Sequence, residues 1–208
     1  MENTVEKNLS IIDENEKLIA NILHDIKSPL YSIKIGLQAH LDTELNKDIF
    51  ETATNIIDYI ENFLVNYSFK QGKFNNKIDI CDIKEIVFRK IESYKYIFID
   101  KNIHIDVFCN DDDYKINSIQ IFLSSIIGNL VSNIAHHAKE NERAEIEIYK
   151  KQNDIFVDFK NKYSKENNKT SLGLDFCKNL AQCCKVEFKF LKTKSEIKAS
   201  LRIPNLNY

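Results

Sequence analysis

The N-terminal part of the chain contains two runs of apolar residues at steps of three and four, the pattern of amphipathic helices. The first run comprises Ile19, Ile22, Leu23, Ile26, Leu30, Ile33, Leu37 and Leu41, and the second comprises Ile49, Ala53, Ile56, Ile57, Ile60, Phe63, Leu64 and Tyr67. The polar segment 42–47 separates them, so the sequence predicts an antiparallel helical hairpin. Because one hairpin cannot cover both apolar stripes, we expect two copies to form a homodimer with a four-helix bundle.

The polar segment 70–77 is typical of a linker. After it, the spacing of hydrophobic residues is helical in some segments and alternating, as in strands, in others. We therefore expect two domains, a hairpin domain at residues 1–71 and a second domain at residues 77–208. Helical spacing recurs at 83–94, 119–138 and 172–184, and strand-like segments occur at 103–107, 146–148, 155–159, 186–190 and 197–203. Helices mixed with antiparallel strands predict an α+β fold, in which an α/β sandwich has its helices on one face of the sheet.

The composition excludes several classes of protein. The formal net charge is −2 and the basic residues are scattered, so we expect no nucleic-acid partner. Charged residues stand near the N-terminus where a signal peptide needs an apolar region. The most apolar stretch, 116–135, contains too many polar residues for a lipid-exposed helix, so we expect a cytoplasmic protein without a membrane segment. The acidic run 111–113 is interpreted as a solvated turn.

One face of the first predicted helix carries candidate chemistry. At about 100° per residue, His24 and Ser28 lie one turn apart on the side opposite the apolar stripe. Tyr31 and Ile35 add exposed apolar surface to that face, as a docking site for another protein needs. Pro29 lies inside the helical run and is expected to bend the helix. A neutral imidazole is a nucleophile near neutral pH, and a hydroxyl one turn away can hydrogen-bond an attacking water.

The segment 24–30 (HDIKSPL) resembles the phospho-acceptor box of sensor histidine kinases, H-[ED]-x-x-[TNS]-P-x, which that family carries on the first helix of a dimerising hairpin. The resemblance implies that His24 carries a phosphoryl group and that Asp25 orients the imidazole and accepts its proton. It implies that Ser28 places the water that hydrolyses the partner's phospho-aspartate. The implied partner is the receiver domain of a cognate response regulator, which supplies its own Mg²⁺.

The resemblance continues into the second domain. Residues 122–138 (FLSSIIGNLVSNIAHHA) are similar to the family's N-box, which implies that Asn129 and Asn133 face a triphosphate and that Asn133 is a magnesium ligand. Residues 171–174 (SLGL), with Gly173, are similar to the second glycine box, and residues 199–204 (ASLRIP) to the closing strand. Asn161 occupies the position of the aspartate that binds adenine in the family's first glycine box, D-x-G-x-G.

The first glycine box departs most from the family pattern. Asn161 replaces the aspartate, Tyr163 and Lys165 replace both glycines, and Ser171 replaces a glycine of the second box. Glycines are needed there because the backbone approaches the nucleotide closely. Only residues 162–169 lie between Asn161 and Thr170, whereas the family has a longer lid there, so the lid is missing. We therefore expect a degenerate nucleotide site that does not bind ATP productively.

The same residues are compatible with several functions. The first is a phosphatase that removes the phosphoryl group from a response regulator, with impaired or absent autokinase activity. The alternatives are an ATP-independent histidine phosphotransferase between regulators, a module that sequesters a regulator, and an active histidine kinase with an unusual lid. His136 and His137, at the end of the N-box-like segment, are expected to be surface or edge residues.

Overall fold

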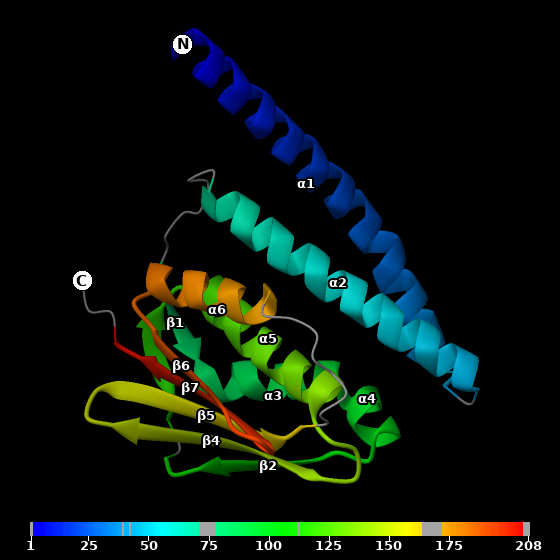
Figure 1. The fold of residues 1–208 in the computed structure, drawn as a ribbon. Coiled ribbons are helices and arrows are strands. Elements are labelled where there is room, and N and C mark those ends of the chain that lie inside the picture. Colours follow the sequence, from blue (N-terminus) through cyan, green and yellow to red (C-terminus); the bar gives the residue numbers. More distant parts are fainter. Residues whose placement is uncertain are drawn as a thin grey trace. The chain divides into compact units, whose positions relative to one another are not determined.

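The computed structural model describes residues 2–38, 40–41, 43–70, 78–111, 113–163 and 172–205. The chain divides into two compact units, residues 1–75 and 76–208. The first unit is a helical hairpin of α1 (Glu2–Gln38) and α2 (Glu44–Lys70), which confirms the predicted hairpin (Figure 1). The Thr43 hydroxyl accepts a hydrogen bond from the Asn46 amide (3.2 Å) and so caps the start of α2. Of the predicted linker 70–77, Lys70 is the last residue of α2, and residues 71–77 lie outside the described residues.

The second unit is a sheet with helices on one face, as predicted, but the sheet is mixed and not wholly antiparallel as the sequence suggested. Its five-stranded sheet has the order β2-β4-β5-β7-β6, in which only β2 and β4 run parallel. The strands are β2 (His104–Cys109), β4 (Arg143–Lys151), β5 (Asp154–Lys162), β6 (Glu187–Lys192) and β7 (Glu196–Ile203). Helices α3 (Ile83–Ser93), α5 (Gln120–His137) and α6 (Leu172–Cys183) cover one face of this sheet (Figure 1).

Buried residues alternate with less buried ones along the strands, and the buried ones form the core of the second unit. On β5, every second residue from Ile155 to Asn161 is buried, so these side chains face the helices. Helix α5 meets them with an almost wholly apolar set of buried residues: Phe122, Leu123, Ile126, Ile127, Leu130, Val131 and Ile134. The apolar stretch 116–135, which lacks a membrane-span pattern, is therefore a core helix preceded by a short strand.

Three short elements were not predicted from the sequence. Strands β1 (Asp79–Asp82) and β3 (Lys115–Ser118) pair as a separate two-stranded antiparallel sheet. Helix α4 (Lys95–Asp100) follows α3 almost directly. Elements of four to six residues are shorter than the window over which a hydrophobic period can be recognised.

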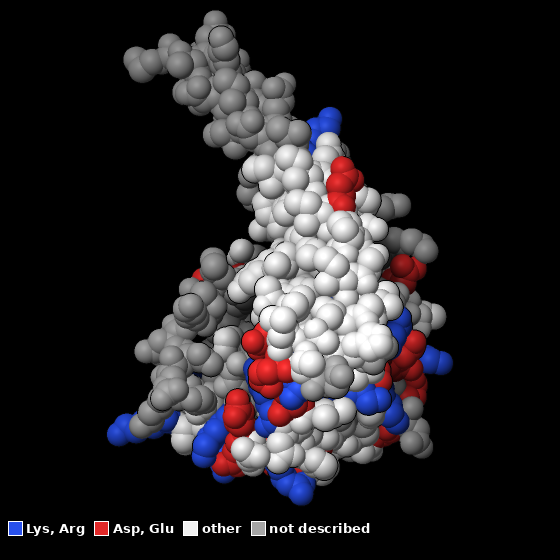
Figure 2. Space-filling model, turned by 90° about the vertical axis from the view of Figure 1, so that its right-hand side faces the viewer, with Lys and Arg blue, Asp and Glu red and all other residues white. Residues whose placement is uncertain are grey.

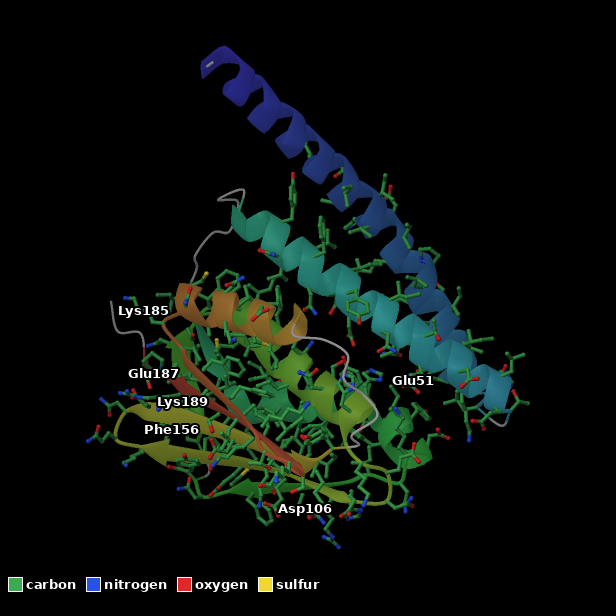
Figure 3. All side chains as sticks on the ribbon, in the orientation of Figure 1. Glu51, Asp106, Phe156, Lys185, Glu187 and Lys189 are labelled. Atoms are coloured by element: carbon green, nitrogen blue, oxygen red, sulfur yellow. The ribbon has the colours of Figure 1, made fainter. Side chains whose placement is uncertain are left out.

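Ion pairs cover the outer face of the large sheet. Arg202 joins Asp154 (2.6 Å) on β5 to Glu187 (2.8 Å) on β6, and Lys198 pairs with Asp158 (2.9 Å). Asp106 and Glu187 mark the two edge strands in Figure 3. On the face shown in Figure 2, basic and acidic side chains lie among one another instead of forming a block of one sign.

Within the described residues, none of the helices is both long and apolar enough to span a membrane. The same part of the chain contains no cluster of three or more histidine, cysteine or acidic residues that could hold a metal ion.

Candidate functional site

His24 projects from an exposed face of α1. Its side chain is 78% exposed and that of Asp25 is 86% exposed, with 3.7 Å between His24 Nδ1 and Asp25 Oδ1. Ser28 is also exposed, one turn further along the helix, and its carbonyl accepts a hydrogen bond from the Ser32 hydroxyl (3.2 Å). Helix α1 continues through Pro29. The three predicted site residues therefore share one solvent-facing turn of α1, accessible to a partner.

A polar cluster next to this turn joins α1 to α2. Glu61 Oε1 of α2 accepts a hydrogen bond from the Tyr31 hydroxyl (2.8 Å) and lies 2.8 Å from Lys27 Nζ. The Lys27 ammonium also lies 5.6 Å from the centre of the Tyr31 ring. Partial burial and the hydrogen bond to Glu61 raise the pKa of Tyr31 well above its usual value. Tyr31 and Ile35 are both exposed, as expected, at 36% and 64%, and Tyr31 also takes part in this cluster through its hydroxyl.

A second face of α1 carries isoleucines that α2 does not cover. The exposed fractions of Ile19, Ile22, Ile26 and Ile33 lie between 42% and 48%. At about 100° per residue this stripe lies roughly 90° around α1 from the residues that face α2, and His24 lies on the opposite side of those residues. Helix α2 has a matching exposed stripe of Leu45, Ile49, Ile56 and Tyr59. Each helix of the hairpin thus has an apolar face without a partner among the described residues.

The asparagines of the N-box-like segment lie on α5. Asn129 and Asn133 are one turn apart and both partly buried. The Asn129 side-chain amide donates a hydrogen bond to the Ser125 carbonyl (2.9 Å) of its own helix. That contact is an ordinary way of satisfying a polar side chain within a helix.

Asn161 and Gly173 lie on other elements of the second unit. Asn161 is the last buried residue of β5, only 7% exposed, and faces the helices. Its side-chain amide donates to the Lys162 carbonyl (3.0 Å). Gly173 is the second residue of α6. The carbonyl of Lys162 also accepts a hydrogen bond from the Lys139 amide (2.9 Å), so the end of β5 lies beside the segment that follows α5.

Tyr163 occupies the first glycine position of the D-x-G-x-G pattern and makes contacts through both its backbone and its side chain. It forms an isolated β-bridge with Ala138, and its amide donates to the Ser195 carbonyl (3.4 Å). Its hydroxyl donates to the Thr193 carbonyl (3.0 Å), and Lys192 Nζ lies 4.5 Å from the centre of its ring. The sequence revealed the substitution but not these partners, because they come from a turn about thirty residues away. Lys165 and Ser171 lie outside the described residues.

His136 and His137, which were expected to be surface or edge residues, lie in the last turn of α5 and are neither fully buried nor fully exposed. Both side chains are partly buried, and the His136 ring packs edge-on against Tyr94 with 6.1 Å between ring centres. Burial lowers the pKa of His137, helped by the positive charges of His136, Lys101 and Lys192. Tyr94 immediately precedes α4, and that helix was not predicted from the sequence.

No protein-family model and no curated protein matches the chain. Solved histidine kinases do match it in fold. The Acinetobacter baumannii histidine kinase AdeS aligns with a TM-score of 0.62 and 11% identity over 88% of this chain and 98% of its own. Histidine kinase ThkA, solved in complex with response regulator protein TrrA, aligns with a TM-score of 0.59 and 17% identity over 97% of this chain and 64% of its own.

A third match is full-length ShkA in complex with AMPPNP, with a TM-score of 0.58 and 10% identity over 90% of this chain and 45% of that one. These alignments extend over both units of the chain. At these identities the likeness concerns the fold: a helical hairpin followed by an α/β sandwich of the histidine kinase type.

Proposed function

We propose that this chain is a cytoplasmic two-component signalling protein that removes the phosphoryl group from the receiver domain of a cognate response regulator. The observation that carries this proposal is the exposed turn of α1 with His24, Asp25 and Ser28, in the sequence HDIKSPL and in a histidine kinase fold. One protein of this fold, ThkA, has been solved with a response regulator.

The chemistry of the step is simple and uses few groups. A water molecule held by the Ser28 hydroxyl attacks the phosphorus of the phospho-aspartate, a new P–O bond forms, and the bond to the aspartate breaks to leave a carboxylate. The His24 imidazole takes the proton of the attacking water. The regulator's own Mg²⁺ stabilises the transferring oxygens, so this chain contributes position and hydrogen bonds.

We also propose that the protein is a homodimer. The uncovered isoleucine stripe of α1 and the apolar stripe of α2 support this, because a second hairpin with the same stripes can bury all of them in a four-helix bundle. His24 lies away from the stripe and remains exposed in such a dimer.

We further propose that the protein works without ATP. Tyr163 supports this, because its side chain and backbone are engaged where the family has a glycine that leaves room for the nucleotide. The side-chain amides of Asn129 and Asn161 are each bonded to a carbonyl of their own helix or strand. These residues do not fit the family's nucleotide site, and no step of the mechanism involves ATP or a magnesium ion on Asn133.

An ATP-independent phosphotransferase is the second candidate, and the geometry of His24 supports it as well. Asp25 lies on the Nδ1 side of the ring, which leaves Nε2 for attack on a phosphoryl group. The imidazole would then keep the phosphoryl group as a P–N bond and pass it to a second aspartate.

The test uses receiver domains from the same organism, each phosphorylated with acetyl phosphate and mixed with a substoichiometric amount of the chain. We expect multiple turnovers of phospho-aspartate to inorganic phosphate with one of them, and loss of turnover in His24→Ala. Label that stays on His24 and passes to another receiver supports the phosphotransferase. If the wild-type chain and His24→Ala both protect the phospho-aspartate from hydrolysis, the chain is a sequestering module. Labelling of His24 by ATP with magnesium contradicts the ATP-independent proposal.

A further inference from the structure

The polar cluster beside His24 has no role in the function proposed above. It consists of Lys27 and Tyr31 on α1 and Glu61 on α2, joined through Glu61 Oε1. We propose that Lys27 is a further catalytic residue that contacts the phosphoryl group at His24, and that Glu61 and Tyr31 position it. This inference rests on the proposed function, because it concerns the same phosphoryl group.

The position of Lys27 on the helix brings its ammonium within reach of that group. Residues three apart on a helix have Cβ atoms about 5–6 Å apart, and Lys27 follows His24 by three. The side chain of Lys27 is flexible and carries three hydrogen-bond donors. Its side chain is 30% exposed, so it is not fully buried and solvent still reaches part of it.

Glu61 holds the lysine in the resting protein. Its carboxylate is 2.8 Å from Lys27 Nζ and is itself only 32% exposed, so this pair is screened less than a fully exposed one. The Tyr31 hydroxyl donates to the same Oε1 at 2.8 Å. The tyrosine therefore remains a donor to Glu61 when the ammonium leaves.

This arrangement allows an exchange of partners without leaving a buried charge alone. A phosphoryl group at His24 brings about two negative charges close to Lys27. The ammonium then turns from Glu61 to a phosphoryl oxygen, and the Tyr31 hydroxyl and solvent still satisfy the carboxylate. Lys27 transfers no proton in this step; it donates hydrogen bonds and offsets charge that develops on the phosphoryl oxygens.

The test measures phosphorylation of His24 by phosphoramidate, which needs no regulator. In this reaction the imidazole forms a P–N bond, ammonia leaves, and the imidazolium releases its ring proton to solvent. Mass spectrometry follows each site, and the exposed residues His40 and His104 serve as internal references in the same sample. We expect Lys27→Gln to slow the labelling of His24 about tenfold relative to the references.

Matched variants separate this role from a structural one. Lys27→Arg keeps the charge and should restore most of the rate. Lys34→Gln removes the lysine that lies over the Phe50 ring (5.5 Å), two turns further along the helix, and should leave the rate unchanged. Glu61→Gln should slow labelling severalfold alone and add little in the Lys27→Gln background, because the carboxylate acts through the lysine.

A neutral reagent gives the decisive comparison. Diethyl pyrocarbonate modifies neutral imidazole and has no anionic oxygens, so Lys27→Gln should leave its rate at His24 unchanged near pH 8. Equal slowing with both reagents, or no slowing with phosphoramidate, would overturn the inference. If His24→Ala leaves regulator dephosphorylation unchanged, the proposed function fails instead, whatever the labelling rates are.

Discussion

His24 has two polar neighbours within one turn of its own helix. Asp25 lies 3.7 Å from its ring, and Ser28 stands one turn away on the same exposed face. These neighbours are local in sequence, so a motif seven residues long contains them all. That is why the sequence alone is enough to group them as a candidate site.

Other functional details at the residue scale could not be predicted, because their partners are distant in sequence. Glu61 meets Tyr31 across thirty positions, and Tyr163 meets Thr193 across another thirty. No period or motif in the chain links such pairs. The lowered pKa of His137 likewise depends in part on Lys101 and Lys192, which are distant from it in sequence.

Ser28→Ala separates hydrolysis from transfer. Removing the hydroxyl takes away the group that holds the attacking water, so we expect hydrolysis of phospho-aspartate to fall about tenfold to a hundredfold. Transfer to the His24 imidazole does not use this water and should change little. Ser32→Ala is the control, because its hydroxyl bonds only to the helix carbonyl of Ser28 in the contacts described above. Equal losses in the two variants contradict the role of Ser28.

His137 should make stability depend on pH. Burial lowers the pKa of His137 in the native state from the ordinary value of 6.5. Between the native pKa and the unfolded pKa, the unfolded chain therefore binds more protons than the native chain. The free energy of unfolding therefore falls as the pH drops below about 6.5. We expect urea midpoints to fall less in His137→Gln than in the wild-type chain between about pH 7.5 and about pH 5.5. An unchanged pH dependence in this variant, with exposed His104→Gln as control, contradicts the assignment.

At the scale of elements, α1 has three different faces. One packs on α2, one carries the isoleucine stripe and one carries His24. The apolar periodicity predicted that the helix exists but not how its apolar residues divide between α2 and the uncovered stripe. That division depends on the side from which α2 approaches, which a single helix does not determine.

Pro29→Ala tests how the helix tolerates its internal proline. Alanine restores the amide that can donate to the Asp25 carbonyl, and proline in a helix interior costs up to about 3 kcal/mol. We therefore expect a higher free energy of unfolding, measured with urea. Gly36→Ala is the control for helix propensity, with an expected gain of about 1 kcal/mol, because nothing lies within 4 Å of an added Cβ there. A less stable Pro29→Ala chain would show that the proline fits this helix better than alanine.

At the scale of the whole molecule, the proposed dimer depends on the exposed stripe of α1. Ile22→Lys with Ile26→Lys places two charges in the expected interface, which should turn a dimer into a monomer in sedimentation velocity experiments. Ile35→Lys is the matched control, because Ile35 is 64% exposed on the His24 face and should leave the dimer intact. A wild-type chain that sediments as a monomer contradicts the proposal.

The order of the long elements was predictable because each is long enough to show its hydrophobic period. The hairpin, α5, and the β4–β5 pair are examples, and the sheet with helices on one face followed from them. The short strands β1 and β3 and the parallel pairing of β2 with β4 were not predicted. Their pairing joins segments far apart in the chain, and four-residue strands carry too little pattern to reveal it.

The most direct test of the account is the decay rate of a phosphorylated receiver domain in the presence of catalytic amounts of the wild-type chain or His24→Ala. The account predicts multiple turnovers of the phospho-aspartate with the wild-type chain and the spontaneous decay rate with the variant, provided that circular dichroism shows both folded. Equal decay rates with the wild-type chain and a folded His24→Ala variant would contradict it.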